Sequence, residues 1–268
     1  MEFKDLIIYT DVDGTVATNH NHIGNVSKAN INAFKEFMDG GGLLGVASGR
    51  NYESIDNVFE HLNFNLPYIE ANGTSIWDNN ISKHIYKNYV SKEFKKQIYN
   101  FVKEDKTLTL TVLDLVSRRV IFNDSRDNLI IDYKRPYITY DEYINSDILK
   151  CAILAKEKDV DRSLNRINEL KLFNDIEISR SATIYLEFFD KKSSKGEGIK
   201  FVLDKLNLGE HKLVCIGDYY NDISMLEIAD IAICPLNAVD EVKKVCDYIT
   251  LSNEDDCIVD VINYLRSL

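Results

Sequence analysis

Residues 6–15 read Leu-Ile-Ile-Tyr-Thr-Asp-Val-Asp-Gly-Thr, an apolar run that ends abruptly at a pair of carboxylates. An unbroken apolar run of this length is typical of a strand that is covered on both faces, as in a parallel sheet. Three further runs end in the same way, at Ser48, at Gly217-Asp218 and at Pro235. The pattern predicts a parallel sheet with polar groups where its strands end.

Segments with helical periodicity lie between and after these runs. Apolar residues at helical spacing occur in residues 31–38, 55–62, 199–206 and 258–265. Alternating strands and helices predict an α/β fold with right-handed crossovers, in which ligands bind beyond the carboxyl ends of the strands. Asp11, Ser48 and Asp218 are expected at those ends.

The middle of the chain has a different pattern. Residues 107–112 alternate Thr with apolar residues, which predicts a half-exposed strand. We expect further strands near residues 119–122, 148–154, 175–178 and 183–188, and helices over 91–104, with Ser91 as N-cap, and over 160–173. These elements form an α+β block. We therefore predict a discontinuous core of residues 1–82 and 190–268, with an inserted domain of residues 83–189.

Composition excludes several classes of protein. The chain has 268 residues, 45% hydrophobic and 28% charged, which is ordinary for a globular protein. A net charge of −11 disfavours sequence-independent nucleic-acid binding, and no apolar run approaches the roughly 20 residues of a membrane span. The start of the chain does not resemble a signal peptide, and the five cysteines form no CxxC motif. We expect a cytoplasmic protein with reduced thiols and no nucleic-acid or membrane partner.

The Asp11-Val12-Asp13-Gly14-Thr15 segment directly follows the first predicted strand. Two carboxylates at i and i+2, followed by a glycine that permits a sharp turn, suit metal-assisted phosphoryl transfer. One carboxylate can attack phosphorus, and the other can protonate the leaving oxygen and later deprotonate water. The alternative is a solvated Asp-Gly turn.

Three other segments are weaker signals taken singly. Ser48-Gly49-Arg50 precedes a helix and could hold a phosphate, although it could also be a simple helix cap. Residues 217–222 place Asp218, Asn221 and Asp222 after a strand, which suits Mg²⁺ or is merely an acidic loop. Lys195 could neutralise nucleophile and phosphate charge, or belong to an ordinary lysine-rich loop.

Two further motifs are interpreted as non-catalytic. Residues 40–45 match GxGxxG but precede a strand, so we interpret them as a helix-to-strand turn. His20-Asn21-His22 lacks further zinc ligands; a role in gating substrate is the alternative. The P-loop motif is absent from the sequence, which excludes a P-loop kinase at the level of motifs.

Together, residues 11–15, Ser48, Lys195 and residues 217–222 resemble the four motifs of the haloacid dehalogenase superfamily. The large insert resembles that of the class IIB, Cof-type phosphatases. Residues 70–73, residues 185–187 and the stretch that starts at Asn237 resemble further segments of that subfamily. The resemblance implies a Rossmann-like core with an α/β cap, Mg²⁺ as cofactor and hydrolysis of phosphate monoesters.

The resemblance also implies a role for each matching position. Asp11 would be the nucleophile and a Mg²⁺ ligand, Asp13 the general acid/base and a ligand through its carbonyl, and Asp218 a further ligand. Lys195 would orient Asp11. The phosphate-binding residues would be Ser48, Gly49, Lys195 and Asn221, and the supporting residues Thr15, Arg50, Asn72, Gly73, Asp222 and Asn237.

The hypothesis is therefore a Mg²⁺-dependent phosphatase for a small phosphorylated metabolite, such as a sugar phosphate, pyridoxal phosphate or flavin mononucleotide. A phosphotransferase or phosphomutase, and a non-catalytic metabolite-binding protein, are the alternatives. Polar or aromatic residues of the insert could contact the substrate, namely Arg118, Arg119, Tyr185 and Glu187. A monomer or weak homodimer is expected.

Overall fold

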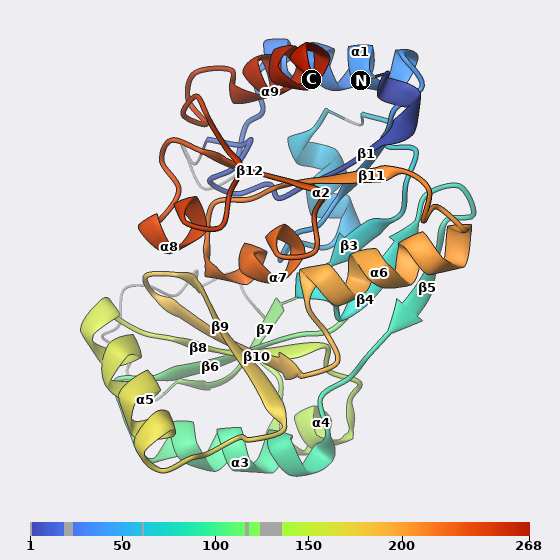
Figure 1. Cartoon of the computed structure of the whole chain (residues 1–268). Helices are drawn as coiled ribbons and strands as arrows, with labels where there is room; N and C mark the ends of the chain where they lie inside the picture. The colour runs from blue at the N-terminus through green and yellow to red at the C-terminus, as the bar shows by residue number, and fades with distance from the viewer. Residues whose placement is uncertain (1, 19–23, 61, 116–117, 124–135) are drawn as a thin grey trace. The chain divides into compact units, whose positions relative to one another are not determined.

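The computed structural model describes residues 2–18, 24–60, 62–115, 118–123 and 136–268 (Figure 1), so His20-Asn21-His22 lies outside the described residues. The chain divides into two compact units, residues 1–86 with 194–268, and residues 87–193. Both divisions fall a few residues later than the boundaries expected from the sequence. The reason at the first division is β5 (Lys83–Lys87), which extends a small sheet of the first unit.

A five-stranded sheet forms the centre of the first unit, in the order β13-β12-β11-β1-β2, and every pairing in it is parallel. The predicted α/β core is thus confirmed. Its strands are β1 (Leu6–Thr10), β2 (Leu43–Val46), β11 (Lys212–Ile216), β12 (Ile231–Pro235) and β13 (Tyr248–Thr250).

Helices cover both faces of this sheet. Leu6 and Ile8 of β1 pack in one core with α1 (Lys28–Asp39) and α9 (Cys257–Ser267), which lie side by side in Figure 1. Ile7 and Tyr9, which point the other way, pack in a second core with α6 (Lys195–Leu206). Because alternate residues are buried on opposite faces, the strand is apolar throughout, as the sequence predicted.

Smaller elements complete the first unit. The sequence-based interpretation missed an antiparallel sheet of β3 (Tyr68–Glu70), β4 (Ser75–Asp78) and β5, together with the 3₁₀ turn η2 (Ala71–Gly73). The remaining elements are η1 (Phe3–Asp5), α2 (Tyr52–Val58), η3 (Tyr220–Asp222), α7 (Ile223–Leu226) and α8 (Asp240–Lys243). Residues 40–42 join α1 to β2, which confirms the turn expected there.

The second unit is a five-stranded antiparallel sheet, in the order β7-β6-β8-β10-β9, packed with helices. The predicted α+β block is confirmed, and Ser91 caps α3 by accepting the Phe94 N–H at 3.1 Å. The elements are α3 (Lys92–Lys103), β6 (Thr109–Leu113), β7 (Arg118–Asn123), α4 (Tyr140–Asn145), β8 (Lys150–Leu154), α5 (Glu157–Glu169), β9 (Ile176–Ala182) and β10 (Tyr185–Asp190).

Two details of the second unit differ from expectation. β6 is not half-exposed, because its threonines are buried as well; Thr111 Oγ1 donates to the Ala152 carbonyl on the neighbouring strand at 3.4 Å. A hydroxyl that finds such a partner can be buried at little cost. The predicted helix over residues 160–173 ends at Glu169, and Lys171 and Phe173 follow with left-handed φ of 50° and 58°.

A buried lysine stabilises the end of α4. Lys95 is 4% exposed, and its ammonium donates to the carbonyls of Tyr143, Ile144 and Ser146 at 3.1, 2.9 and 2.7 Å. The last carbonyls of a helix have no partner within the helix, so Lys95 supplies a donor to the carbonyls of Ile144 and Ser146 and a second donor to that of Tyr143, which also accepts the Ser146 N–H.

The five cysteines are free thiols, as expected from the sequence. Within the described part of the chain, every helix is too short or too polar to cross a bilayer.

Candidate active site

The loop after β1 brings the first carboxylates to the end of the central sheet. The Asp11 N–H donates to the Ile216 carbonyl of β11 at 2.8 Å, which continues the β1–β11 pairing to the strand ends. Gly14 has φ +86°, and a Cβ there would lie 2.5 Å from Asp218 Oδ2. Only glycine fits both the turn and the close approach, so the loop and the β11 end are brought together.

Thr15 connects the two strand ends. Its hydroxyl lies 2.5 Å from Asp218 Oδ1 and 3.5 Å from Asp11 Oδ2. All three side chains are buried, and Thr15 is wholly so. The structure therefore places Asp11 and Asp218 together, although 207 positions separate them in sequence.

Lys195 enters this cluster from the first residue of α6. Its ammonium donates to Asp11 Oδ1 and to Asp222 Oδ1, both at 2.5 Å, and it is 0% exposed. The helix start is held close to η2, because a Cβ on Gly73 would lie 2.1 Å from the Ser194 carbonyl oxygen. Lys195 is thus a contact of the first predicted carboxylate and not a loop lysine in solvent.

Asp222 organises the loop after β11. Its Oδ2 accepts the backbone N–H groups of Asp218 and Tyr219, each at 2.9 Å, while Oδ1 accepts from Lys195. One fully buried carboxylate thus fixes both the loop and the ammonium, which is more than the acidic-loop interpretation allowed.

The charges of this cluster are not balanced. Oxygens of Asp11, Asp218 and Asp222 lie within 4.8 Å of one another, and one ammonium faces these three carboxylates. Burial, with the charges of Asp222 and Asp13, raises the pKa of Asp11 to about 7 despite Lys195. Burial, with the charges of Asp222 and Asp11, raises the pKa of Asp218 well above its usual value.

The surroundings of Lys195, in contrast, favour its charged form. Burial alone would lower its pKa, but the attraction of Asp11 and Asp222 outweighs burial and raises it. The lysine therefore stays protonated, and the excess negative charge of the cluster suits a hard cation with oxygen ligands.

Ser48, Gly49 and Arg50 follow β2, which is the neighbour of β1. Ser48 is fully buried, and its hydroxyl accepts the Arg50 N–H at 3.3 Å. Arg50 forms a bidentate ion pair with Asp13, in which Nε donates to Oδ2 at 2.7 Å and Nη2 donates to Oδ1 at 2.6 Å. Asp13 is therefore fixed by Arg50, a contact that the sequence analysis did not anticipate.

Four asparagine side chains connect the loops around the cluster. Asn221 Nδ2 donates to Asn72 Oδ1 at 3.3 Å, and the Asn72 N–H donates to the Ser48 carbonyl at 2.9 Å. Asn237 Nδ2 donates to the Gly14 carbonyl at 2.7 Å, and its oxygen accepts the Asn253 N–H at 3.0 Å. Asn253, which also donates to the Ala17 carbonyl, was missed because nothing in its local sequence marks it.

The four candidate substrate contacts of the insert lie in the sheet of the second unit. Arg118 and Arg119 are in β7; Tyr185 and Glu187 are in β10, and two strands, β6 and β8, lie between them. Arg119 pairs with Asp114. Glu187 is 2% exposed and pairs with the equally buried Lys150 at 2.7 Å. Arg119 and Glu187 thus belong to separate ion pairs, and contact of the four residues with substrate stays a prediction.

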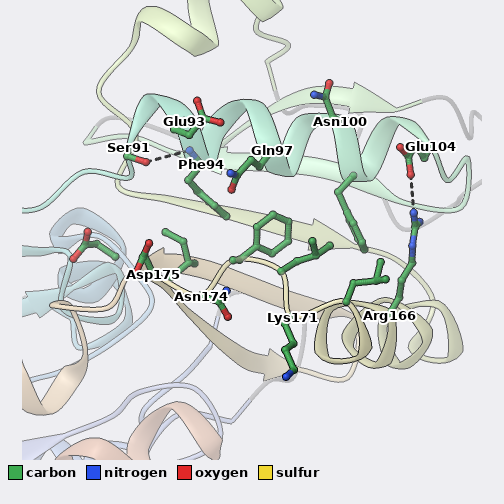
Figure 2. Close-up of a pocket in the computed structure, with 16 residues that line it drawn as sticks. Ser91, Glu93, Phe94, Gln97, Asn100, Glu104, Arg166, Lys171, Asn174 and Asp175 are labelled. Atoms are coloured by element: carbon green, nitrogen blue, oxygen red, sulfur yellow. Dashed lines mark hydrogen bonds and ion pairs between the residues drawn. The ribbon is translucent and has the colours of Figure 1, made fainter.

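Figure 2 shows a groove of about 890 Å³ in the second unit, between α3 and the segment that follows α5. Its buried wall includes Phe94, Phe101 and Phe173, and Arg166 pairs with Glu104 at one end at 2.6 Å. The groove contains none of the predicted site residues. The chemistry expected from the sequence is instead concentrated at the strand ends of the first unit.

Comparison with known proteins agrees with this geometry. Residues 8–262 match the family model of the haloacid dehalogenase-like hydrolases. A putative phosphatase of Streptococcus pyogenes is 27% identical over an alignment of 270 positions that covers 96% of this chain and 96% of that one. A 5-amino-6-(5-phospho-D-ribitylamino)uracil phosphatase of Bacillus subtilis is 22% identical and again covers 96% of both.

Among solved structures, a subclass IIB sugar phosphatase of the same superfamily superposes with a TM-score of 0.81. It is 21% identical, and the match covers 98% of this chain and 99% of that one. The parallel core, the antiparallel insert and the family match agree. The chain therefore belongs to the haloacid dehalogenase-like hydrolases, and its fold is similar to that of a subclass IIB sugar phosphatase.

Proposed function

We propose that this chain hydrolyses phosphate monoesters of small metabolites, with Mg²⁺ as cofactor and a phosphorylated Asp11 as intermediate. The observation that carries the proposal is the buried contact of Asp11 with Lys195 inside a cluster of three carboxylates. Buried like charges repel one another, so such a cluster destabilises the fold. Its presence therefore supports a functional role.

The donor set fits a magnesium ion. Asp222 already accepts three hydrogen bonds, which makes it a residue that positions Lys195 and the loop. Asp11 and Asp218, with the carbonyl of Asp13, would hold the ion. A bound divalent cation would offset the repulsion between the Asp11 carboxylate and a phosphate dianion.

The side chains of the chain divide the reaction between them. Asp11 attacks phosphorus, the ester P–O bond breaks, and Asp13, which enters this step in its protonated form, gives its proton to the leaving oxygen and becomes a carboxylate. Asp13 then takes a proton from water, which attacks the phosphorylated Asp11, so that phosphate leaves and both carboxyl groups regain their starting states. Lys195 stays charged throughout and holds Asp11 in place.

The remaining predicted residues have supporting roles in this proposal. Ser48, Gly49 and Asn221 bind the phosphoryl group together with Lys195. Thr15, Arg50, Asn72, Gly73, Asp222 and Asn237 hold the loops that carry these groups. The relatives named above act on phosphorylated ribitylaminouracil and on sugar phosphates, so a polyhydroxylated phosphate monoester is the substrate class that we propose, recognised in part by Arg118, Arg119, Tyr185 and Glu187.

Phosphate release from a panel of sugar, polyol, pyridoxal and flavin monophosphates tests the proposal. Release should require Mg²⁺ and should fall by about 10⁴-fold or more in Asp11→Asn, as expected for removal of a nucleophile. Asp5→Asn is the matched control, because it makes the same change at an exposed residue just before β1 and should leave turnover unchanged.

The alternatives predict different products. A phosphomutase or phosphotransferase would yield an isomerised or newly phosphorylated sugar in place of free phosphate. A binding protein would retain a metabolite tightly without turnover. Metal-independent release, or full release by Asp11→Asn, would contradict the proposed mechanism.

A further inference from the structure

We propose that Glu70 is a positioning residue, which fixes the turn that carries Arg50 and, through Arg50, the carboxylate of Asp13. The inference rests on the proposed function, since it assigns to Asp13 the proton transfers of the phosphatase reaction. Glu70 is the first residue of the 70–73 segment, but no role was assigned to its side chain above, and its contacts are with Tyr52, Ser75 and His84 and not with a reacting group.

Glu70 is a carboxylate at the end of β3 that is 1% exposed and fully engaged. Its Oε1 accepts the backbone N–H of Tyr52 at 2.5 Å. Its Oε2 accepts the Ser75 hydroxyl at 3.0 Å and lies 2.8 Å from Nε2 of His84. A charge buried to this degree is tolerated only with such partners, so the site is specifically constructed around it.

Aromatic rings enclose the same contact. The Tyr52 ring stacks on Trp77, with centroids 3.9 Å apart and planes within 8° of parallel. His84 meets Trp77 edge-on at 4.9 Å. Because Tyr52 is also the first residue of α2, the ring stack and the Glu70 carboxylate both fix the start of that helix, two residues after Arg50.

The backbone on each side of Glu70 is bonded to the turn after β2. The Ser48 N–H donates to the Ile69 carbonyl at 2.9 Å, and the Ala71 N–H donates to the Arg50 carbonyl at 3.1 Å. Glu70 lies between these two bonds, and its side chain adds a third to Tyr52. The turn of residues 48–52 is therefore attached at three points to residues 69–71.

This attachment holds strained backbone. Ala71, Asn72 and Gly73 follow Glu70 with φ of 50°, 62° and 91°. Left-handed φ is unfavourable for residues that have a Cβ, so Ala71 and Asn72 keep it only where the surroundings enforce it. The contacts of Glu70 are part of that enforcement.

Arg50 transmits the position of the turn to the reaction centre. Its guanidinium binds both oxygens of Asp13, and this fork geometry tolerates little displacement. A shift of about 1 Å in a group that transfers a proton can lower the rate by about 10²-fold. Loss of Glu70 should therefore lower kcat more than it raises KM.

The first test compares two substitutions of Glu70. Glu70→Leu should lower kcat about 10- to 100-fold with KM changed less than about threefold. Glu70→Gln keeps an oxygen for the Tyr52 N–H and should retain at least about a third of kcat. Glu53→Leu removes an exposed carboxylate from the same helix start and should stay within about twofold of the parent protein.

A double-mutant cycle identifies the route. If Glu70 acts through Arg50, Glu70→Leu in the Arg50→Ala background should add less than about twofold to the loss caused by Arg50→Ala alone. Independent effects would multiply instead. Multiplied losses, or a folded Glu70→Leu protein with the parent kcat, would overturn the proposal.

A second pair of variants covers the case in which Glu70→Leu does not fold. Tyr52→Pro removes both the N–H that Glu70 accepts and the aromatic ring. Proline suits this position, because it is the first of the helix and follows the extended Asn51. Tyr52→Ala removes the ring and keeps the N–H. We expect kcat of Tyr52→Pro at least about tenfold below that of Tyr52→Ala; equal values would contradict the role of the N–H contact.

A readout without substrate separates this inference from the proposed function. In nitrogen-15 NMR spectra, the Nε–H of Arg50 should give a slowly exchanging signal, assigned by its loss in Arg50→Lys. That signal should persist in Glu70→Gln and broaden or shift in Glu70→Leu. An unchanged signal in Glu70→Leu overturns the positioning role, whereas absent turnover by the parent protein refutes the proposed function alone.

Discussion

Lys195 in the first unit and Lys95 in the second are both buried lysines in helices, yet their surroundings move their pKa values in opposite directions. Lys195 lies between two carboxylates, which outweigh burial and raise its pKa. Lys95 donates to three backbone carbonyls, which carry no net charge, so burial dominates and lowers its pKa. A buried lysine thus organises a cluster of charges in the first unit and caps the end of a helix in the second.

The comparison shows what distinguishes a reactive centre from a structural one. Around Lys95, each donor meets a neutral acceptor and the polar groups are satisfied. Around Lys195, three carboxylates face one ammonium, and burial together with the neighbouring carboxylates raises the pKa values of Asp11 and Asp218. Under the proposed function, this excess charge destabilises the free protein and is offset when a cation is bound.

The largest expected effect comes from exchanging each lysine for methionine. Lys195→Met should lower phosphate release by about 10²- to 10³-fold, because a preorganised charge next to the nucleophile is lost. Lys95→Met should leave kcat of the folded protein within about twofold. Assays of phosphate release at a temperature at which both variants are folded measure the difference.

Stability does not separate the two variants, which makes activity the informative readout. Lys95→Met removes the ammonium from three carbonyls, of which that of Tyr143 keeps another donor, the Ser146 N–H, and should cost about 3 kcal/mol. Lys195→Met leaves buried carboxylates unpaired at a cost of about 3–5 kcal/mol. Urea unfolding checks both values. Equal losses of activity in the two folded variants would refute the distinction between the two sites.

Gly14→Ala should have the next largest effect. A Cβ at that position, with φ +86°, would lie 2.5 Å from Asp218 Oδ2 and would push the loop away from the β11 end. We expect a cost of about 1–3 kcal/mol in unfolding free energy and at least a tenfold loss of kcat. Urea unfolding and phosphate-release assays of the Gly14→Ala protein measure these two effects.

Gly209→Ala is the control for this change, because a Cβ there meets no atom within 4 Å. It should alter the unfolding free energy by less than about 0.5 kcal/mol. A Gly14→Ala protein that behaves like the control would mean that the Asp11 loop does not need to approach Asp218.

These contrasts also show how far the sequence could predict the site. Asp11, Asp13 and Asp218 were predictable because each follows an apolar strand, and strand ends of a parallel sheet meet at one edge. Lys195 and Asp222 were placed by resemblance, since an isolated lysine or acidic loop has no local signature. The pairing of Arg50 with Asp13 depends on two separate loops and could not be derived from either.

The unpredicted parts share one physical property: each depends on contacts between residues that are distant in sequence. Lys95 is buried because α4, some 45 residues later, ends beside it. Thr109 and Thr111 alternate with apolar residues as an exposed strand face would, but tertiary contacts bury them. Glu70 and His84 approach each other across a small sheet whose strands were too short to recognise from their pattern.

A moderate effect is expected in the pH dependence of stability. The pKa of Asp11 is about 7 in the folded protein and near 4 when unfolded, so the folded form binds this proton more tightly. Its contribution to stability is complete below about pH 4 and is lost as pH rises through about 7; Asp218 acts in the same direction. Metal-free protein should therefore melt at a lower temperature at pH 8 than at pH 5.5.

Mg²⁺ should oppose this loss, because it replaces the protons that stabilise the cluster. At about 100 times its Kd, it should raise Tm by about 5–10 °C at pH 8 and by less at pH 5.5. Calorimetry in chelator and in Mg²⁺ measures both shifts. Asp11→Asn should flatten the pH dependence, and a larger Mg²⁺ shift at low pH would contradict this account of the excess charge.

The smallest expected effect concerns Asn237, where the charged centre reaches the exposed rim of the first unit. Its amide joins the Gly14 carbonyl to the Asn253 N–H, at 2.7 and 3.0 Å, but the side chain is exposed and water can replace both bonds. Asn237→Ala should therefore lower kcat/KM by only about two- to fivefold, the equivalent of one weak hydrogen bond. Asn237→Asp keeps the acceptor for Asn253 and loses the donor to Gly14, so the pair of variants assigns the effect to one side. If both variants lower kcat/KM by about 10²-fold, the organised centre extends to the rim. The difference from the Lys95 site would then be larger than the buried residues alone indicate.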